Sequence, residues 1–251
     1  MNQPLAYIHP DAQIADNVVI EPFVTISKDV VVGKGTWIGP HVTIMEGARI
    51  GENCRIFPGA VISAIPQDLK YAGEKTQVII GNNTTIRECV TINRGTTAAN
   101  CSVIGDNCLL MAYVHVAHDC IIGNNCILAN ATTLAGHIEI QDYAIIGGMS
   151  AIHQFVKVGK HAFISGGSLV GKDVPPFCKA ARYPLSYVGV NSIGLRRKDI
   201  SSETINHILD IYRILYVRGY NTSRGIDIIE AEIDSSPEKD LILDFVRNSV
   251  R

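Results

Sequence analysis

The chain has 251 residues, a net charge of −2, 18% charged and 6% aromatic residues, and seven cysteines. A net charge so near zero gives no electrostatic basis for binding nucleic acid or an anionic membrane surface. No apolar run reaches the roughly 18 residues that a transmembrane helix needs, and MNQPLAYIHP lacks the basic and apolar regions of a signal peptide. The number of cysteines is odd, and no two of them form a CxxC pair. Neither feature suggests a set of disulfide bonds, so we expect a cytoplasmic protein in a reducing compartment.

Aliphatic residues recur at every sixth position through most of the chain. The first run comprises Ile8, Ile14, Ile20, Ile26, Val32, Ile38, Ile44, Ile50, Ile56 and Ile62. The register resumes over 80–92 and again over 104–170, and Gly or Asn often follows the aliphatic residue, as in Gly81-Asn82-Asn83. Gly and Asn tolerate the positive φ of a tight turn, so the chain bends in every repeat. This hexapeptide pattern predicts a mainly β protein, a parallel β-helix with three bends per coil.

Most of the cysteines fit a second inward position, four residues after each aliphatic one. Small residues such as Ala12 and Val18 occupy it in the first coil. Cys54, Cys108, Cys120 and Cys126 fall at the same position. Because a buried free cysteine behaves as a small hydrophobic residue, we expect these four to lie in the core. Cys89, Cys101 and Cys178 lie outside this register and receive no role.

Two segments interrupt the repeat, residues 63–77 (SAIPQDLKYAGEKTQ) and residues 93–103 (NRGTTAANCSV). A solenoid accepts insertions at its corners, and such loops commonly form binding surfaces. The alternative is that each insertion is only a surface bulge.

The repeat ends near residues 174–177, and from Ser201 the apolar residues follow helical spacing. Further helices are predicted over about 225–233 and from Ser236, where Ser followed by Pro237 makes a good N-terminal cap. A helical tail would cover the open end of the solenoid. We therefore predict a β-helix domain over residues 1–190 and a C-terminal α-helical domain over 191–251.

The histidines are spaced by about one coil. His118 and His137 are 19 residues apart, and His137 and His153 are 16 apart. With 18 residues per coil, these three side chains would cluster along one edge, with His115 close by. None of these histidines occupies an inward position of the repeat, so we do not expect them to be buried in the core. The alternative to a shared site is that they are exposed and have no common role.

Two chemistries suit an edge of histidines. Some β-helix trimers of the carbonic anhydrase type bind zinc through histidines that include a pair five residues apart, and this chain has no such pair, so we expect no metal site. The second chemistry is acyl transfer to a hydroxyl, which needs a base such as histidine. His118 could be that base with Asp119 as its orienting carboxylate, and the Gly136 N–H could stabilise the oxyanion.

The motifs IPQDLKYAGE, TINRGT, HVAHDC, LAGH, IIGGMSAIHQF, DVPP and GVNSIGLRR occur in this order. In order and spacing the chain resembles the acyl-carrier-protein–UDP-N-acetylglucosamine O-acyltransferase family of lipid A biosynthesis, over essentially its whole length. The resemblance implies a homotrimer of left-handed parallel β-helices with active sites between subunits. It also implies transfer of an (R)-3-hydroxyacyl chain from acyl carrier protein to the 3-hydroxyl of UDP-N-acetylglucosamine. No cofactor or metal is implied, because phosphopantetheine arrives on the carrier protein.

By motif, the resemblance makes His118 the general base, Asp119 its partner and Gly136 the oxyanion donor. The implied sugar-binding residues are Asp68 and Lys70, with His115 and His137 nearby. The implied uridine diphosphate residues are His153, Gln154, Asn191 and Arg197. Cations and amide donors are what a diphosphate requires.

Three positions depart from the family pattern: Asn93 stands in place of histidine in TINRG, Ile193 in place of an acidic residue, and Pro184 in place of histidine. Contacts to the nucleotide, the sugar or the acyl chain could differ there. Gly166 and Gly167 would line the acyl cleft and offer little obstruction. We therefore expect an acyl chain of about fourteen carbons or more, because each buried methylene adds to binding.

Other functions remain open at this stage. A related N-acyltransferase of the same pathway shares the β-helix but carries an additional N-terminal domain, for which a repeat beginning at Ile8 leaves no room. Some relatives instead acylate the 3-amino analogue of the sugar. A sugar-nucleotide acetyltransferase would use acetyl-CoA. A structural or ice-binding solenoid would show aligned threonines where this chain has histidines.

Overall fold

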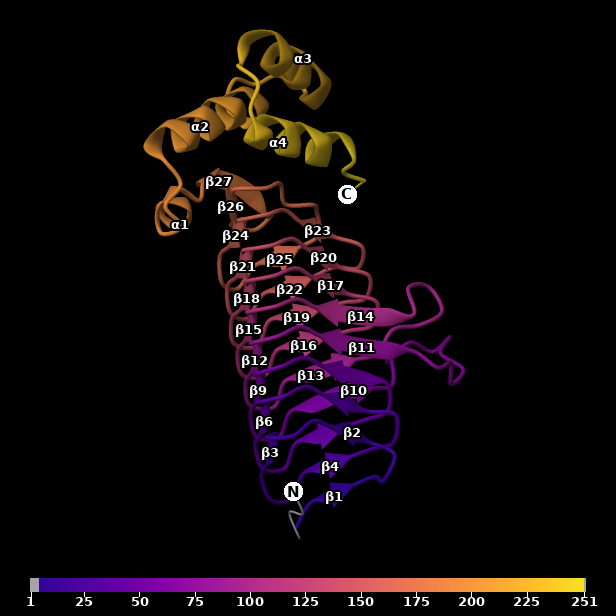
Figure 1. The fold of residues 1–251 in the computed structure, drawn as a ribbon. Helices are drawn as coiled ribbons and strands as arrows, with labels where there is room; N and C mark the ends of the chain where they lie inside the picture. The colour runs from indigo at the N-terminus through magenta and orange to yellow at the C-terminus, as the bar shows by residue number, and fades with distance from the viewer. Residues whose placement is uncertain (1–4, 251) are drawn as a thin grey trace.

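The computed structural model describes residues 5–250 as a three-sided rod of stacked coils with helices at its C-terminal end (Figure 1). Sheet A contains β1 (Tyr7–Ile8), β4 (Thr25–Ile26), β7 (Thr43–Ile44), β10 (Val61–Ala64), β13 (Thr91–Asn93), β16 (His115–Val116), β19 (Thr133–Leu134), β22 (Ala151–Ile152) and β25 (Leu169–Val170). Sheet B contains β2 (Gln13–Ile14), β5 (Val31–Val32), β8 (Ala48–Ile50), β11 (Gln77–Ile80), β14 (Cys101–Ile104), β17 (Ile121–Ile122), β20 (Glu139–Ile140) and β23 (Lys157–Val158). Sheet C contains β3 (Val19–Ile20), β6 (Trp37–Ile38), β9 (Arg55–Ile56), β12 (Thr85–Ile86), β15 (Leu109–Leu110), β18 (Ile127–Leu128), β21 (Ile145–Ile146), β24 (Phe163–Ile164), β26 (Cys178–Ala181) and β27 (Ser186–Val190).

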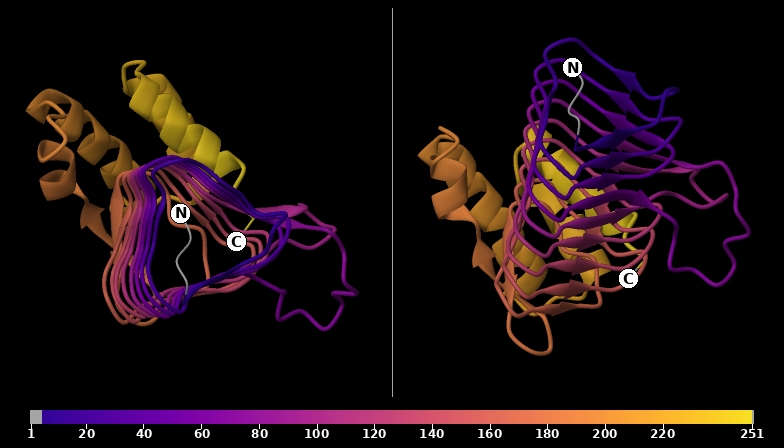
Figure 2. Two further views of the ribbon diagram at one scale, coloured as in Figure 1. Left: turned by 60° about the horizontal axis from the view of Figure 1, so that its bottom comes forward. Right: turned by 90° about the horizontal axis from the view of Figure 1, so that it is seen from below.

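The inward residues of successive coils stack directly on one another. In sheet B, Ile104 pairs with Ile122, and Ile122 pairs with Ile140 on the next coil. All three side chains are buried, as are their counterparts in sheets A and C. The strand pairs of the coils are parallel, and among the described residues only β26 and β27 pair antiparallel. The predicted left-handed parallel β-helix followed by helices is confirmed, and the view along its axis shows the triangular cross-section (Figure 2).

The cysteines lie where the register places them. Cys54, Cys108, Cys120 and Cys126 are all buried in the core, as predicted. Of the three cysteines outside the register, Cys178 is also buried, in β26 beneath the helical tail.

Both insertions leave the rod at the same corner, between sheets A and B. The first joins β10 to β11 over residues 65–76, and the second joins β13 to β14 over residues 94–100. The two loops project from the side of the rod in Figure 1 and again in both views of Figure 2. We call them the 65–76 loop and the 94–100 loop.

Within the part of the chain that the structure describes, four helices follow the rod: α1 (Ser192–Arg196), α2 (Ser202–Tyr216), α3 (Thr222–Glu232) and α4 (Pro237–Arg247). Ser236 caps α4 as predicted, since its hydroxyl accepts the Lys239 N–H. The predicted start of α3 near Gly225 is too late, because Asn221 caps the helix and accepts the Arg224 N–H. The short helix α1 was not predicted. Among residues 5–250, no helix is both long and apolar enough to cross a bilayer.

The tail packs on the last coil through Tyr212 of α2. This side chain is fully buried, and its hydroxyl donates a hydrogen bond to the Pro176 carbonyl. The division into 1–190 and 191–251 remains a prediction, and its residues 1–4 and 251 lie outside the described residues. The structure has β27 ending at Val190 and α1 beginning at Ser192.

Two adjacent isoleucines test the register directly. Ile122 is 1% exposed inside the rod, whereas Ile121 is 50% exposed on its outer face. We expect Ile122→Ala to lower the free energy of unfolding by about 2–5 kcal/mol, because it leaves a cavity. Ile121→Ala should change it by less than about 0.5 kcal/mol. Urea denaturation measures both, and equal losses would contradict the inward–outward assignment.

Candidate active site

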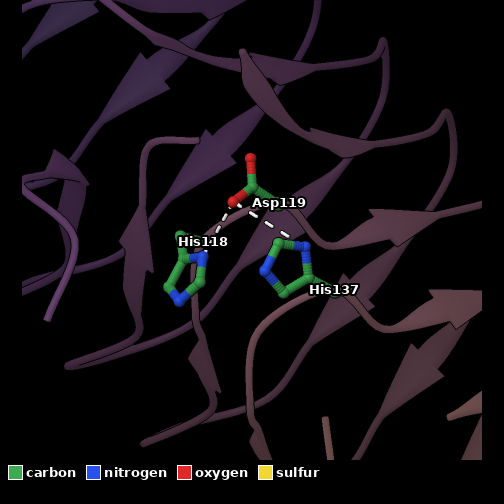
Figure 3. Close-up of side chains that lie close together, drawn as sticks. All are labelled: His118, Asp119 and His137. Atoms are coloured by element: carbon green, nitrogen blue, oxygen red, sulfur yellow. Dashed lines mark hydrogen bonds and ion pairs between the residues drawn. The ribbon is translucent and has the colours of Figure 1, made fainter. Parts of the chain in front are cut away.

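The polar side chains of interest lie on the A–B corner, just past the two loops. His118 and Asp119 form the turn between β16 and β17, and His137 lies in the turn one coil further on. Asp119 has φ 58° and His137 has φ 62°, so equivalent left-handed turn positions bring their side chains together. Figure 3 shows the three side chains converging.

His118 and Asp119 form a buried hydrogen-bonded pair (Figure 3). His118 Nδ1 lies 2.8 Å from Asp119 Oδ2, and the side chains are 8% and 0% exposed. An ionised carboxylate only accepts hydrogen bonds, so the pairing places the ring proton on Nδ1 and leaves Nε2 as an acceptor. Nε2 faces the 65–76 loop, 4.0 Å from Asp68 Oδ2.

Asp119 is held in its charged form. Burial acts to raise the pKa of this carboxyl, but hydrogen bonds from the Thr96 hydroxyl and from His118 outweigh burial, and the pKa lies below the usual value. Oδ1 accepts the N–H groups of Thr96 at 2.9 Å and Ala99 at 3.3 Å. Oδ2 accepts the Thr96 hydroxyl at 2.7 Å in addition to His118. Four donors therefore occupy the carboxylate.

Thr96 is a site residue that the sequence did not reveal. The repeat register stops at the insertion, so nothing in the spacing relates residue 96 to residue 119. The sequence indicated only that the insertion containing Thr96 interrupts the repeat shortly before His118. That position suggested a binding surface and did not suggest that Thr96 orients the Asp119 carboxylate.

Gly136 lies directly against the His118 ring. A Cβ at this position would come within 2.6 Å of His118 Cε1, so only glycine fits without moving the ring. Among residues 5–250, the Gly136 N–H has no hydrogen-bond acceptor. It is therefore available to a bound carbonyl oxygen, in keeping with the predicted oxyanion role.

The neighbouring histidines have distinct environments. His137 meets the His118 ring edge-on at 5.0 Å, and its Nδ1 lies 3.9 Å from Asp119 Oδ2. His115 projects from β16, where its Nδ1 lies 2.7 Å from the Thr91 hydroxyl. Burial lowers the pKa of His115, which favours its neutral form.

His153 lies on the same A–B corner as His118 and His137, as expected, but not at the turn position equivalent to His137. Phe155, which follows His137 by one full coil, stacks on the His137 ring at 4.7 Å. His153 lies two residues earlier, exposed, with Nδ1 3.2 Å from the Gln154 carbonyl. The interval of 16 residues is two short of a coil, so Phe155 and not His153 occupies the turn position one coil after His137. His153 and Gln154 still lie on the A–B corner.

The 65–76 loop carries the two predicted sugar residues. Asp68 is half-buried and its Oδ1 accepts the Lys70 N–H at 3.0 Å, which fixes the loop backbone around it. The Lys70 side chain is exposed. Asn93, a departure from the family pattern, is buried and donates through Nδ2 to the Ile65 carbonyl at 2.8 Å, so it anchors the base of this loop.

Asn191 and Arg197 lie elsewhere on the rod. Asn191 caps α1 by accepting the Gly194 N–H, and its Nδ2 donates to the His161 carbonyl at 3.0 Å. Both residues line a pocket of about 290 Å³ together with Lys179. In Figures 1 and 2, α1 and the projecting loops lie on opposite sides of the rod. One chain therefore does not bring these residues to His118.

The remaining predicted positions are also away from His118. Gly166 and Gly167 are exposed in the turn between β24 and β25, at the corner between sheets C and A. A Cβ on Gly167 would meet no atom within 4 Å, so the space there is open. Pro184 is exposed between β26 and β27, and Ile193 is exposed on α1.

His118, Asp119 and His137 are also the residues that could hold a metal ion. One ligand atom from each lies within 4.8 Å of the others. The hydrogen bonds compete with such a site, because the donors on Asp119 already occupy both of its oxygens. A metal would have to displace the His118 proton from Nδ1 and the Thr96 hydroxyl.

Comparison with known proteins gives consistent matches along the chain. A family model described as "Udp N-acetylglucosamine O-acyltransferase; Domain 2" matches residues 173–251, and a bacterial transferase hexapeptide model matches residues 29–64 and 101–136. Relatives named acyl-carrier-protein–UDP-N-acetylglucosamine O-acyltransferase include one from Thermodesulfovibrio yellowstonii, 47% identical over 98% of this chain and 96% of its own length. Another, from Chlorobaculum parvum, is 60% identical over 74% of this chain and 71% of its own length.

Solved structures agree. The crystal structure of a UDP-N-acetylglucosamine acyltransferase from Bacteroides fragilis matches with a TM-score of 0.98 and 52% identity, over 100% of this chain and 98% of that one. The enzyme from Francisella novicida matches with a TM-score of 0.96 and 40% identity, over 100% of this chain and 92% of that one.

Thermal unfolding in the presence of metal tests the alternative of a metal site. A metal that binds the native state raises the midpoint of unfolding. We expect dialysis against EDTA, and then addition of zinc, to leave the midpoint unchanged, because hydrogen bonds already occupy the ligand atoms of Asp119. A zinc-dependent rise that His137→Ala abolishes would contradict this expectation and establish a metal site.

Proposed function

The chain belongs to the acyl-carrier-protein–UDP-N-acetylglucosamine O-acyltransferase family, and we propose that His118 is the general base of its reaction. In that reaction an (R)-3-hydroxyacyl chain passes from acyl carrier protein to the glucosamine 3-hydroxyl of UDP-N-acetylglucosamine, the first step of lipid A biosynthesis. The observation that supports the role of His118 most directly is its buried 2.8 Å hydrogen bond to Asp119. That bond leaves Nε2 unprotonated and facing the loop that carries Asp68.

The chemistry follows from the two ring nitrogens. Nε2 takes the proton of the sugar 3-hydroxyl while the oxygen attacks the thioester carbonyl carbon. The carbonyl oxygen gains negative charge, which the Gly136 N–H stabilises. The tetrahedral intermediate then collapses, the carbon–sulfur bond breaks, and the His118 proton passes to the departing phosphopantetheine thiolate. Asp119 stabilises the imidazolium that exists between the two transfers.

Asp68 is well placed to hold the sugar during this step. Its Oδ2 lies 4.0 Å from His118 Nε2, so a sugar hydroxyl beside the base could also donate a hydrogen bond to this carboxylate. Lys70 follows in the same loop with an exposed ammonium that could bind oxygen atoms of the substrate. These sugar contacts, like those of His115 and His137, belong to the proposal.

A homotrimer would complete the site. Within one chain, Asn191 and Arg197 at α1 and Gly166 and Gly167 at the C–A corner are separated from His118 by the width of the rod. A neighbouring copy that turns these surfaces toward the A–B corner would bring them to the base, placing the nucleotide and the acyl chain between subunits. Leu69, at the tip of the 65–76 loop, is 104% exposed, which favours contact of this loop with another copy. We propose that the enzyme acts in the cytoplasm with no metal or cofactor beyond the carrier-borne phosphopantetheine.

A transfer assay tests the base. With UDP-N-acetylglucosamine and a 3-hydroxyacyl carrier protein as substrates, His118→Ala should lower the turnover rate by at least about 10²-fold, because no other group removes the hydroxyl proton. His41→Ala is the matched control, since His41 is exposed at a different corner and stacks on Phe23. Turnover by His118→Ala near that of the wild type would remove His118 from this role.

Donor competition tests the acyl cleft. Gly166 and Gly167 leave the C–A corner open, and each methylene that a cleft buries contributes about 0.8 kcal/mol. We expect donors of about fourteen carbons or more to outcompete a ten-carbon donor in a mixture of 3-hydroxyacyl carrier proteins, with product lengths measured by mass spectrometry. A clear preference for the ten-carbon donor would exclude an open cleft.

A further inference from the structure

We propose that Thr96 is a positioning residue of the active site, which sets the direction and strength of the hydrogen bond between Asp119 and His118. The proposal rests on the proposed role of His118 as general base. Thr96 comes from the 94–100 loop, outside the repeat, and 23 residues separate it from the carboxylate that it contacts.

The direction of the Thr96 hydroxyl is fixed by its two partners. Its oxygen accepts the N–H of Ala98 at 3.2 Å and lies 2.7 Å from Asp119 Oδ2. A backbone N–H can only donate and an ionised carboxylate can only accept, so the hydroxyl proton must point to Oδ2. Oδ2 thus receives the Thr96 hydroxyl and the His118 Nδ1–H together.

The backbone of the same residue fixes the other carboxylate oxygen. The Thr96 N–H donates to Asp119 Oδ1 at 2.9 Å. The hydroxyl and the backbone amide of Thr96 therefore each donate a hydrogen bond to a different oxygen of the Asp119 carboxylate. Thr96 is 9% exposed and the Asp119 side chain 0% exposed, so water cannot replace a lost partner without rearrangement. The carboxylate cannot turn, and Oδ2 stays aimed at His118.

The segment 93–96 also holds the loop that carries Asp68. Asn93 Nδ2 donates to the Ile65 carbonyl at 2.8 Å, and Arg94 Nε donates to the Ser63 carbonyl at 3.1 Å. One short segment therefore orients the base through Asp119 and anchors the base of the 65–76 loop. His118 and the start of the loop that carries Asp68 are therefore both held by this segment.

Removing the hydroxyl should loosen the carboxylate while the rest of the pair stays in place. Without it, Oδ2 keeps only the His118 hydrogen bond, and the N–H groups of Thr96 and Ala99 hold Oδ1 alone. The other charged or titratable groups facing the pair are Asp68 from the 65–76 loop and His137 from the next coil, which the substitution leaves in place. The loss should therefore appear in kcat, through the orientation of His118, and not in the binding of UDP-N-acetylglucosamine.

Three variants separate the hydroxyl from the shape of the side chain. Thr96→Val keeps the shape and removes the hydroxyl, Thr96→Ser keeps the hydroxyl, and Thr97→Val repeats the first change at the exposed neighbouring residue. We expect Thr96→Val to lower kcat about 10- to 100-fold, the cost of a hydrogen bond to a charged group, with little change in KM for UDP-N-acetylglucosamine. Thr96→Ser should retain most of the activity, and Thr97→Val all of it.

A double-mutant cycle shows whether Thr96 acts through His118. In the His118→Ala background, Thr96→Val should lower the residual rate less than about twofold, because the group that it positions is absent. The proposal is overturned if Thr96→Val matches the wild type, if Thr96→Ser loses as much activity as Thr96→Val, if Thr96→Val raises KM and leaves kcat unchanged, or if the losses multiply. Failure of the proposed function gives a different result from failure of this proposal. If His118 is not the general base, His118→Ala retains wild-type turnover whatever the activity of the Thr96 variants.

Discussion

The stacking of coils in register is the constraint on which the whole molecule depends. Backbone N–H groups in the strands of one coil donate to carbonyls on the next, as when His115 N–H donates to the Thr132 carbonyl at 2.9 Å. Inward aliphatic residues lie directly over one another as a consequence, and so do the turns. The candidate active-site corner is a product of this stacking, because His118, Asp119, Gly136 and His137 are turn positions on adjacent coils.

Much of this arrangement could be predicted from the sequence, because a strict six-residue period determines which residues point inward and which turns lie above one another. The six-residue register located the core, the four buried cysteines and the neighbourhood of His118, Asp119 and Gly136. The contact between Gly136 and His118 follows from a separation of one full coil. The same rule explains why Phe155 stacks on His137, because these two residues are separated by one full coil.

What the sequence could not supply lies where the period is broken. Thr96 lies in an insertion that does not follow the repeat. Its hydrogen bonds to Asp119 can therefore be seen only in the structure. The five-residue helix α1 is too short to show a helical spacing, and Asn221 extends α3 backward through a cap that the apolar pattern does not mark. The separation of Asn191 from His118 depends on the side of the rod at which the chain leaves the last coil. The spacing of residues in the sequence does not determine that side.

The placement of both loops just before the turn that carries His118 has a consequence for how the rod can change in length. A rod of equivalent coils can change in length by whole units of 18 residues, but these units are not interchangeable along its axis. A coil duplicated on the N-terminal side of β7 would lengthen the rod and leave every distance around His118 intact. A coil inserted between His118 and Gly136, or between Thr96 and Asp119, would separate groups that must touch. We therefore expect changes in coil number to be tolerated only before β10, because the segment from β10 to β22 contains contacts that a whole-coil insertion would separate.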